Sequence, residues 1–294
     1  ANATITASGT GTLTLSADDN TANGAGNVNI GGAATVGGLV TANQAISITA
    51  ANVVIDPTQA GTTVNAGAGD VTLKPSTAVA VDVGTAAAGA FIVDNAEIGK
   101  ITSTGTITIG DGALASTMVV QGVSAGAKNI SLATAGTIND NAANTAVTLT
   151  TGTLTLDAAS TIGNTTTFNV DVAKLAITTE ASFSVTNAGT LTDLSVTTNG
   201  AVATQTLAST GLTTYTVAEA GNNTTITDVT SAANLNFSYQ NTVGNITVGT
   251  VNAVAGNVTL TATAGAITDN ANDATRITGN VVSLTATNGI GAGG

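Results

Sequence analysis

The segment at residues 256–291 reads GNVTLTATAGAITDNANDATRITGNVVSLTATNGIG, and residues 128–163 read KNISLATAGTINDNAANTAVTLTTGTLTLDAASTIG. The two segments share one order of aliphatic, hydroxyl and small residues, offset by 128 to 130 residues. The corresponding aliphatic positions are Ile130 and Val258, Leu132 and Leu260, Ile138 and Ile267, Val147 and Ile277, Leu156 and Leu284, and Ile162 and Ile290. Internal similarity of this kind is typical of a repeat architecture.

The recurring local unit is a pair of aliphatic residues separated by one small or polar residue. Alternation with period two predicts a strand with one buried face, and Gly, Asn or Asp at the borders predicts turns. Such pairs are Leu13/Leu15, Val28/Ile30, Ile46/Ile48, Val71/Leu73, Val79/Val81, Ile107/Ile109, Ile130/Leu132, Val147/Leu149, Leu154/Leu156, Phe183/Val185, Ile246/Val248, Val258/Leu260 and Val282/Leu284. We find no segment with a capped helical periodicity.

Strands with so few inward residues cannot build a deep sandwich core, but they line a narrow core if many copies stack. Leu284 follows Leu260 by 24 residues, and Ile290 follows Ile267 by 23. Either interval is a suitable length for one coil, meaning one circuit of the chain around a solenoid axis. We therefore predict an all-β fold, a parallel β-helix of roughly 12–15 coils that occupies residues 1–294 as one continuous solenoid on the order of 60–70 Å long.

Stacked coils place like residues upon like. We expect aliphatic residues inside and Thr, Ser and Asn in outward rows. Like charges would repel each other at the spacing of about 4.8 Å between strands. Charged residues should therefore lie at turns, as expected for Asp18, Asp19, Asp140, Asp269 and Asp273, which stand beside Asn or Gly or close to them.

Composition excludes several kinds of chemistry. The chain has no His, Cys or Trp, which removes imidazole acid–base catalysis, thiolate nucleophiles and zinc sites with N and S ligands. The net charge of −12 is unfavourable for binding nucleic acid. We find neither a transmembrane segment nor a secretory signal at Ala1. Both ends lie within the strand pattern, so we expect the chain to be a segment of a longer fibre or a filament subunit.

The motifs GNVTLTATAGAITDNA and ITGNVVSLTATNGIG, together with VTNAGTLT at residues 185–192, resemble the repeat regions of filamentous haemagglutinin-like adhesins exported by two-partner secretion. The resemblance is clearest over residues 128–163 and 181–294. It implies a right-handed β-helix on a bacterial surface. The Asn-Pro-Asn-type motifs of that family's secretion domain are not visible in this sequence.

The sequence contains two groups of residues that resemble a catalytic or a metal site only weakly. β-Helix folds also host polysaccharide lyases and hydrolases, for which Asp18/Asp19 and Asp269/Asp273 are the closest acidic pairs, with only Tyr215 and Tyr239 as tyrosine platforms. The loop with Asp269, Asn270, Asn272 and Asp273 has hard oxygen ligands that suit calcium, and its counterpart keeps Asp140 and Asn141 but has Asn144. We interpret both loops as Asx turns, and we predict no catalytic, cofactor or metal residues.

Two further motifs carry little functional signal. The Asn-x-Ser/Thr sequons are expected by chance in such a chain and matter only if the source organism glycosylates, and Gly31-Gly32 and Gly37-Gly38 are read as corners rather than phosphate loops. The sequons start at Asn2, Asn129, Asn164, Asn222, Asn223, Asn236, Asn245 and Asn257.

The function expected from these features is structural and adhesive. The chain would be a non-enzymatic, secreted or surface-exposed filament segment that associates with itself, end to end or laterally, and contacts surface glycans or proteins. An S-layer or sheath lattice protein and a carbohydrate-active β-helix enzyme are the alternatives.

Overall fold

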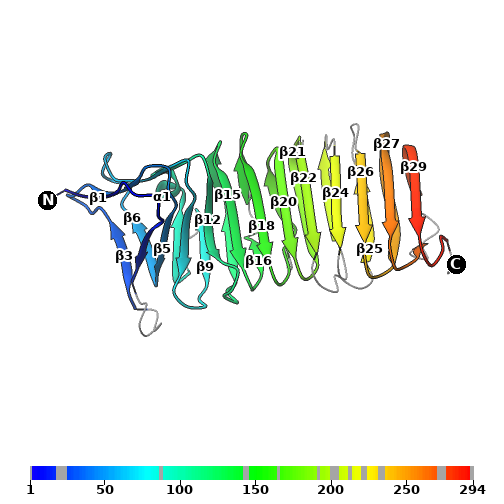
Figure 1. Ribbon diagram of the computed structural model, residues 1–294, viewed down its shortest axis with the longest axis horizontal. Helices are drawn as coiled ribbons and strands as arrows, with labels where there is room; N and C mark the ends of the chain where they lie inside the picture. The colour runs from blue at the N-terminus through cyan, green and yellow to red at the C-terminus, as the bar shows by residue number, and fades with distance from the viewer. Residues whose placement is uncertain are drawn as a thin grey trace.

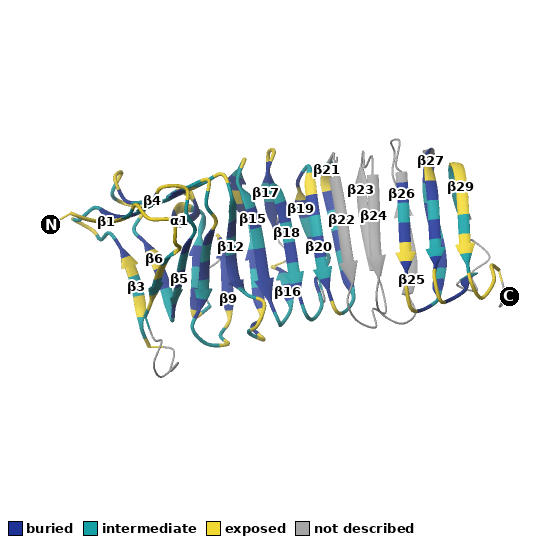
Figure 2. Ribbon diagram, viewed as in Figure 1, coloured by how far each residue is buried: buried dark blue, intermediate teal, exposed yellow. Residues whose placement is uncertain are grey.

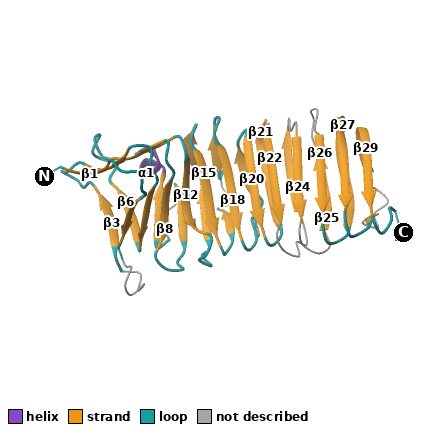
Figure 3. Ribbon diagram, viewed as in Figure 1, coloured by secondary structure: helices purple, strands orange, loops and turns teal. Residues whose placement is uncertain are grey.

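The computed structural model describes residues 2–17, 25–85, 89–141, 146–163, 166–190, 193–198, 205–210, 214–219, 224–230, 236–269 and 276–291. Within them the fold is all-β, with parallel sheets and one short helix, and the elements follow one another along a rod with the termini at opposite ends (Figure 1). Strands dominate throughout the rod, and loops lie at its edges (Figure 3). The arrangement is consistent with the β-solenoid that the sequence predicts.

One face of the rod is a ladder of twelve parallel strands, which we call the long ladder. Each strand pairs with the strand one coil later, because the hydrogen bonds of stacked strands run along the axis. In order the strands are β2 (Leu13–Ser16), β5 (Ile46–Ala50), β8 (Val71–Pro75), β12 (Thr106–Asp111), β15 (Asn129–Thr134), β18 (Thr153–Ala158), β20 (Lys174–Thr179), β22 (Asp193–Thr198), β24 (Thr214–Glu219), β26 (Asn236–Asn241) and the second halves of β27 (Ile246–Ala262) and β29 (Arg276–Ala286).

A second ladder has two parts. The first part is β1 (Ala3–Ala7), β4 (Gly37–Thr41), β7 (Thr63–Gly67) and β11 (Ile101–Ser103). The second part is β14 (Val123–Gly126), β17 (Val147–Leu149), β19 (Phe168–Asp171), β21 (Phe183–Thr190), β23 (Gln205–Thr210), β25 (Thr224–Thr230) and the first halves of β27 and β29. Since β27 and β29 both pass a corner, they join this ladder to the long ladder.

The third side of the rod is shorter and less regular. It contains β3 (Asn27–Ile30) paired with β6 (Asn52–Ile55), and the series β10 (Phe91–Asp94), β9 (Val81–Gly84), β13 (Met118–Gln121) and β16 (Ile138–Asp140). Single bridges extend it from Ile138 to Ile162 and Phe183, and β28 (Ile267–Asp269) lies between Ile246 and Ile290. β10 is an extra strand, because it pairs with β9 only ten residues earlier in the chain.

The predicted register of the two repeated segments is confirmed at the pairs that the structure describes. Leu260 pairs with Leu284, and Ile267 with Ile290. In the other segment, Leu132 pairs with Leu156 and Ile138 with Ile162. The two segments therefore form separate coils with the same register. That residues 1–294 form a single domain stays a prediction.

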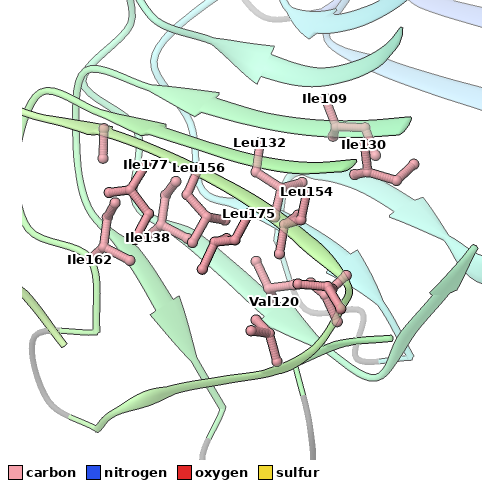
Figure 4. Packing of buried hydrophobic residues seen from close by; sticks show 14 of the residues in the cluster. Ile109, Val120, Ile130, Leu132, Ile138, Leu154, Leu156, Ile162, Leu175 and Ile177 are labelled. Atoms are coloured by element: carbon pink, nitrogen blue, oxygen red, sulfur yellow. The ribbon is translucent and has the colours of Figure 1, made fainter. Parts of the chain in front are cut away.

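The core is a column of stacked aliphatic side chains between the ladders (Figure 4). On the long ladder the inward residues pack as the alternation predicts, and most of them have no exposed surface. Those on five consecutive strands are Val71 and Leu73, Ile107 and Ile109, Ile130 and Leu132, Leu154 and Leu156, and Leu175 and Ile177. Because each pair lies directly above the previous one, every coil completes the burial of its neighbours.

The sequence predicted no capped helix. This expectation was wrong, because residues Asn95–Gly99 form the helix α1. Asp94 caps the helix by accepting a hydrogen bond from the Glu97 backbone N–H, while Glu97 accepts one from the Asp94 N–H, which forms a capping box. The helix lies between the two parts of the second ladder. There the Asn95 side chain accepts from the Ser124 N–H at 3.0 Å and donates to the Gly122 carbonyl at 2.8 Å, as the backbone of a strand would.

Candidate functional surface

The outward residues of the long ladder form a row that we call the hydroxyl row. The ladder register aligns the central outward residue of each strand with that of the next, and these positions carry Ser or Thr on eleven strands and Ala176 on the remaining one. In order they are Thr14, Ser47, Thr72, Thr108, Ser131, Thr155, Ala176, Ser195, Thr216, Ser238, Thr259 and Ser283. Adjacent positions are about 4.8 Å apart along the axis.

The described side chains of the hydroxyl row are half-buried or exposed, so their hydroxyl groups face the surface while the aliphatic residues beside them face the core (Figure 2). The row is neutral. Among the described residues beside this row there is one ion pair, in which Lys74 Nζ lies 3.3 Å from Asp111 Oδ2. Also on the long ladder, burial, followed by the nearby Glu180 carboxylate, raises the pKa of the Asp157 carboxyl above its ordinary value. The long ladder thus offers hydroxyl groups at regular intervals with few charges nearby.

The acidic pairs from the sequence do not make a described site. Asp18, Asp19, Asn270, Asn272 and Asp273 lie outside the described residues. Asp269 is exposed at the end of β28. Within the described part of the chain, no group of three or more acidic, His or Cys side chains is placed to hold a metal ion. The calcium and catalytic interpretations of these loops gain no geometric support.

Asp140 was expected in a solvated turn, and this was wrong. It is the last residue of β16 and is buried, because it stands two positions after Ile138 and shares its inward face. Its Oδ2 atom accepts hydrogen bonds from the Asn169 backbone N–H at 3.1 Å and from Asn169 Nδ2 at 3.0 Å. Asn144 lies outside the described residues, whereas Asn141 donates to Gln121 at 2.9 Å. The Asp140 carboxylate therefore joins two coils.

Polar residues also occupy corners that the sequence assigned to the outside. The Thr134 and Thr179 hydroxyl groups each donate to a backbone carbonyl of the previous coil, and Asn241 accepts from the Val243 and Gly244 N–H groups. All three residues are buried. A signal was present in the sequence, since each of them follows the second inward apolar residue of its strand by two positions. Their role is to satisfy backbone groups where the chain turns.

Asp82 and Glu97 are two further carboxylates that the sequence did not single out, and both are buried. Glu97 Oε1 accepts from the Ile55 N–H at 3.0 Å, and Oε2 accepts from the Asp94 N–H at 3.0 Å. Burial raises the pKa of the Glu97 carboxyl above its ordinary value. Because both oxygens are bonded to backbone, Glu97 ties α1 to β6 and presents no carboxylate to a substrate.

Tyr239 cannot serve as a sugar platform because it is buried in the core, with its ring centroid 6.4 Å from that of Phe237. Tyr215 lies in β24, and its side chain is outside the described part of the structure. The described hollows are shallow, with volumes of about 160 to 500 Å³. None of these hollows is lined by two carboxylates. None of these four hollows therefore supplies an acidic pair for catalysis.

Gly31-Gly32 lies at a corner as expected, but the assignment of Gly37-Gly38 to a corner was wrong, because these two residues lie within the strand β4. Gly31 has a positive φ of 82°, and a Cβ atom there would lie 2.6 Å from Thr62 Oγ1. Gly37 begins β4, where a Cβ atom would lie 2.2 Å from the Gly31 nitrogen. The chain therefore needs glycine where these two segments touch. This steric requirement explains the two glycine pairs without a phosphate-binding role.

The described sequons are mostly structural. Asn129 accepts from the Thr153 N–H at 3.0 Å, and Asn245 accepts from the Ala266 N–H at 2.8 Å, so each side chain joins consecutive coils. Asn2 accepts from the Val36 N–H, while Asn257 is exposed. For the other four, the structure describes no side chain: Asn164, Asn222, Asn223 and Asn236.

In the part of the chain that the structure describes, no helix is long and apolar enough to cross a membrane. Comparison of this chain with protein-family models, with characterised proteins and with solved structures gives no match.

Proposed function

We propose that this protein is a right-handed parallel β-helix of 12–15 coils that serves as a stiff structural and adhesive segment of an extracellular filament. The observation that carries the proposal is the uninterrupted long ladder from β2 to β29. Right-handed crossovers are strongly preferred between parallel strands of one sheet, which supports the handedness. The resemblance of residues 128–163 and 181–294 to filamentous haemagglutinin-like repeats supports the location.

The mechanism is mechanical. Ladder hydrogen bonds run along the rod axis, and the aliphatic column runs parallel to them. Bending the rod would stretch the ladder hydrogen bonds and separate the packed aliphatic side chains on its outer side, so the rod resists bending. Twelve strands have eleven intervals of about 4.8 Å, so the described ladder is about 53 Å long. A rod of this kind holds a binding surface away from the cell without a flexible linker.

Adhesion is assigned to the hydroxyl row. Neutral Ser and Thr side chains at a fixed repeat donate and accept hydrogen bonds without selecting for charge. They suit surface glycans or other proteins as partners better than nucleic acid, since the chain has 17 acidic and only 5 basic residues. The same rows suit lateral contacts between rods.

Binding to immobilised surface polysaccharides tests the adhesive function. We expect the double variant Thr72→Asp, Thr108→Asp to lose binding, because it places two carboxylates on the hydroxyl row. The matched control is Thr102→Asp, an exposed strand residue on β11 outside the long ladder. Equal binding by both variants would refute the assignment to the hydroxyl row.

Electron microscopy of the native assembly tests the structural function. Filaments support the proposal, while a two-dimensional lattice would favour the S-layer or sheath alternative. We also propose that the protein has no catalytic activity. Reproducible polysaccharide cleavage that is lost in Asp269→Asn or Asp18→Asn would refute that part and favour the carbohydrate-active alternative.

A further inference from the structure

The long ladder carries opposite charges along its two edges. On β8, Asp70 stands just before the strand and Lys74 is its last outward residue, with Thr72 of the hydroxyl row midway between them. Asp70 is exposed, and its Oδ1 atom accepts from the Thr106 N–H at 2.7 Å. Lys74 Nζ lies 3.3 Å from Asp111 Oδ2, and its side chain is 36% exposed. Because a carboxylate has two acceptor oxygens and an ammonium has three donor hydrogens, both groups can take a further partner.

Opposite charges also flank the hydroxyl row on β18 and β20. Lys174 is exposed at the start of β20, and Glu180 is exposed one residue beyond its end. Asp157 on β18 lies near Glu180 and is aligned with Thr178 of β20. Among the described residues, neither carboxylate forms an ion pair with a cation, and Lys174 forms none with an acid. Along the strand direction Lys174 is about 20 Å from Glu180 and about 13 Å from Asp157, too far to pair within one copy.

A second copy can pair these charges through a twofold axis parallel to the rod. Such an axis sets each coil opposite the same coil of the second copy and reverses the strand direction, so the hydroxyl row faces itself. Ser and Thr hydroxyl groups both donate and accept hydrogen bonds, which makes an identical row self-complementary. Lys74 of each copy then faces Asp70 of the other. Lys174 of each copy faces the strand edge that carries Asp157 and Glu180 of the other.

The face is close to the size that a stable dimer needs. The described ladder is about 53 Å long and the span from Asp70 to Lys74 is about 13 Å, which gives about 700 Å² on each copy. Stable interfaces bury about 800 Å² on each partner. An antiparallel pair centred on Ser131 would also bring Asp70 to Lys174, but it would cover only nine of the twelve strands. The parallel pair therefore covers more of the described ladder.

We propose that two copies of this chain lie side by side and parallel, joined through their long ladders about a twofold axis along the rod. Lys174 of one copy pairs with Asp157 and Glu180 of the other, and Lys74 pairs with Asp70. The proposal rests on the filament function and names a second copy as the lateral partner of the hydroxyl row. Because pairing covers that row, polysaccharide competes with the second copy for this face.

Cross-linking of single-cysteine variants tests the arrangement, in a chain that has no cysteine of its own. Sheets that pack face to face lie about 10 Å apart, so a bismaleimide of that span should link identical positions across the twofold axis. We expect Thr72→Cys, Ser131→Cys and Thr259→Cys each to form dimers at similar rates. Thr102→Cys is the control, because Thr102 is exposed on β11, outside the long ladder. Dimers from Ser131→Cys alone, which indicate the antiparallel pair, or rates no higher than that of Thr102→Cys would overturn the proposal.

Charge exchange on β20 tests the contacts, with the dimer dissociation constant measured by sedimentation equilibrium. Lys174→Glu should raise that constant by about tenfold or more, because it places like charges together at two equivalent contacts. Glu180→Lys should also raise it in the wild type. Added to Lys174→Glu, however, Glu180→Lys should lower it by about threefold or more, since opposite charges then meet across the twofold axis. Both residues are exposed, so circular dichroism should show an unchanged fold. A Glu180→Lys effect of the same sign in both backgrounds would overturn the proposal.

Electron microscopy separates failure of this pairing from failure of the filament function. Filaments that are one rod wide would overturn the pairing and leave the filament function standing. Paired rods that form no filament would support the pairing and refute the filament function.

Discussion

The substitution Leu132→Ala tests how much the stacked core contributes to the free energy of unfolding. Leu132 lies on β15 between Ile109 of the previous coil and Leu156 of the next, and none of the three has exposed surface. Removing a buried leucine side chain in this way costs about 2–5 kcal/mol, since the rigid coils above and below cannot collapse into the cavity. We take about 3 kcal/mol as the central value.

The assay is equilibrium unfolding in urea. With a dependence on urea of about 3 kcal/mol per molar, the midpoint should fall by about 1 M. Ser131→Ala is the matched control, because Ser131 is the adjacent outward residue of the same strand, and its midpoint should move by less than about 0.2 M. Midpoints that fall equally for the two variants would refute the assignment of inward and outward residues.

Three further outcomes are expected. Asp140→Ala should cost about 1–3 kcal/mol in thermal unfolding, because both Asn169 donors lose their acceptor, and an unchanged melting temperature would contradict that role. For Glu97, burial raises the folded-state pKa above the unfolded value, so stability conferred by its protonation is present at low pH and is lost as pH rises through the folded pKa. The wild type should therefore gain stability relative to Glu97→Gln between pH 7 and pH 4, and a relative loss would show that the hydrogen bonds to the carboxylate outweigh burial. Lys74→Ala should cost less than about 1 kcal/mol because the ion pair with Asp111 is partly exposed, and a larger loss would mean that the pair is structurally important.

The regular parts of the fold follow from the sequence because period-two alternation decides which residues face inward. Leu154 and Leu156, for example, are placed correctly by that pattern alone, and the repeat gives their partners one coil away. The stacking of like on like also explains why the outward positions are so often Ser or Thr. The inward and outward faces of the strands and their alignment between coils can therefore be predicted from the local alternation, repeated in every coil.

The irregular parts do not follow from the alternation, because two local signals compete there. The Asn neighbours of Asp140 indicate a turn residue, although its spacing from Ile138 places it inside. The helix α1 is only five residues long, too short for a helical periodicity, yet Asp94 and Glu97 have the spacing of a capping box. The extra strand β10 could not be foreseen, since its pairing with β9 depends on a local return of the chain.

Distances between spin labels test the central claim, that strands stack one per coil along the axis, most directly. Thr14 and Thr155 are five ladder steps apart, and so are Thr155 and Thr259. Labels at these outward positions should give about 24 Å for each pair and about 48 Å for Thr14 with Thr259. Two short distances that agree and add up to the long one support the stacked rod. A Thr14–Thr259 distance well below that sum would contradict it.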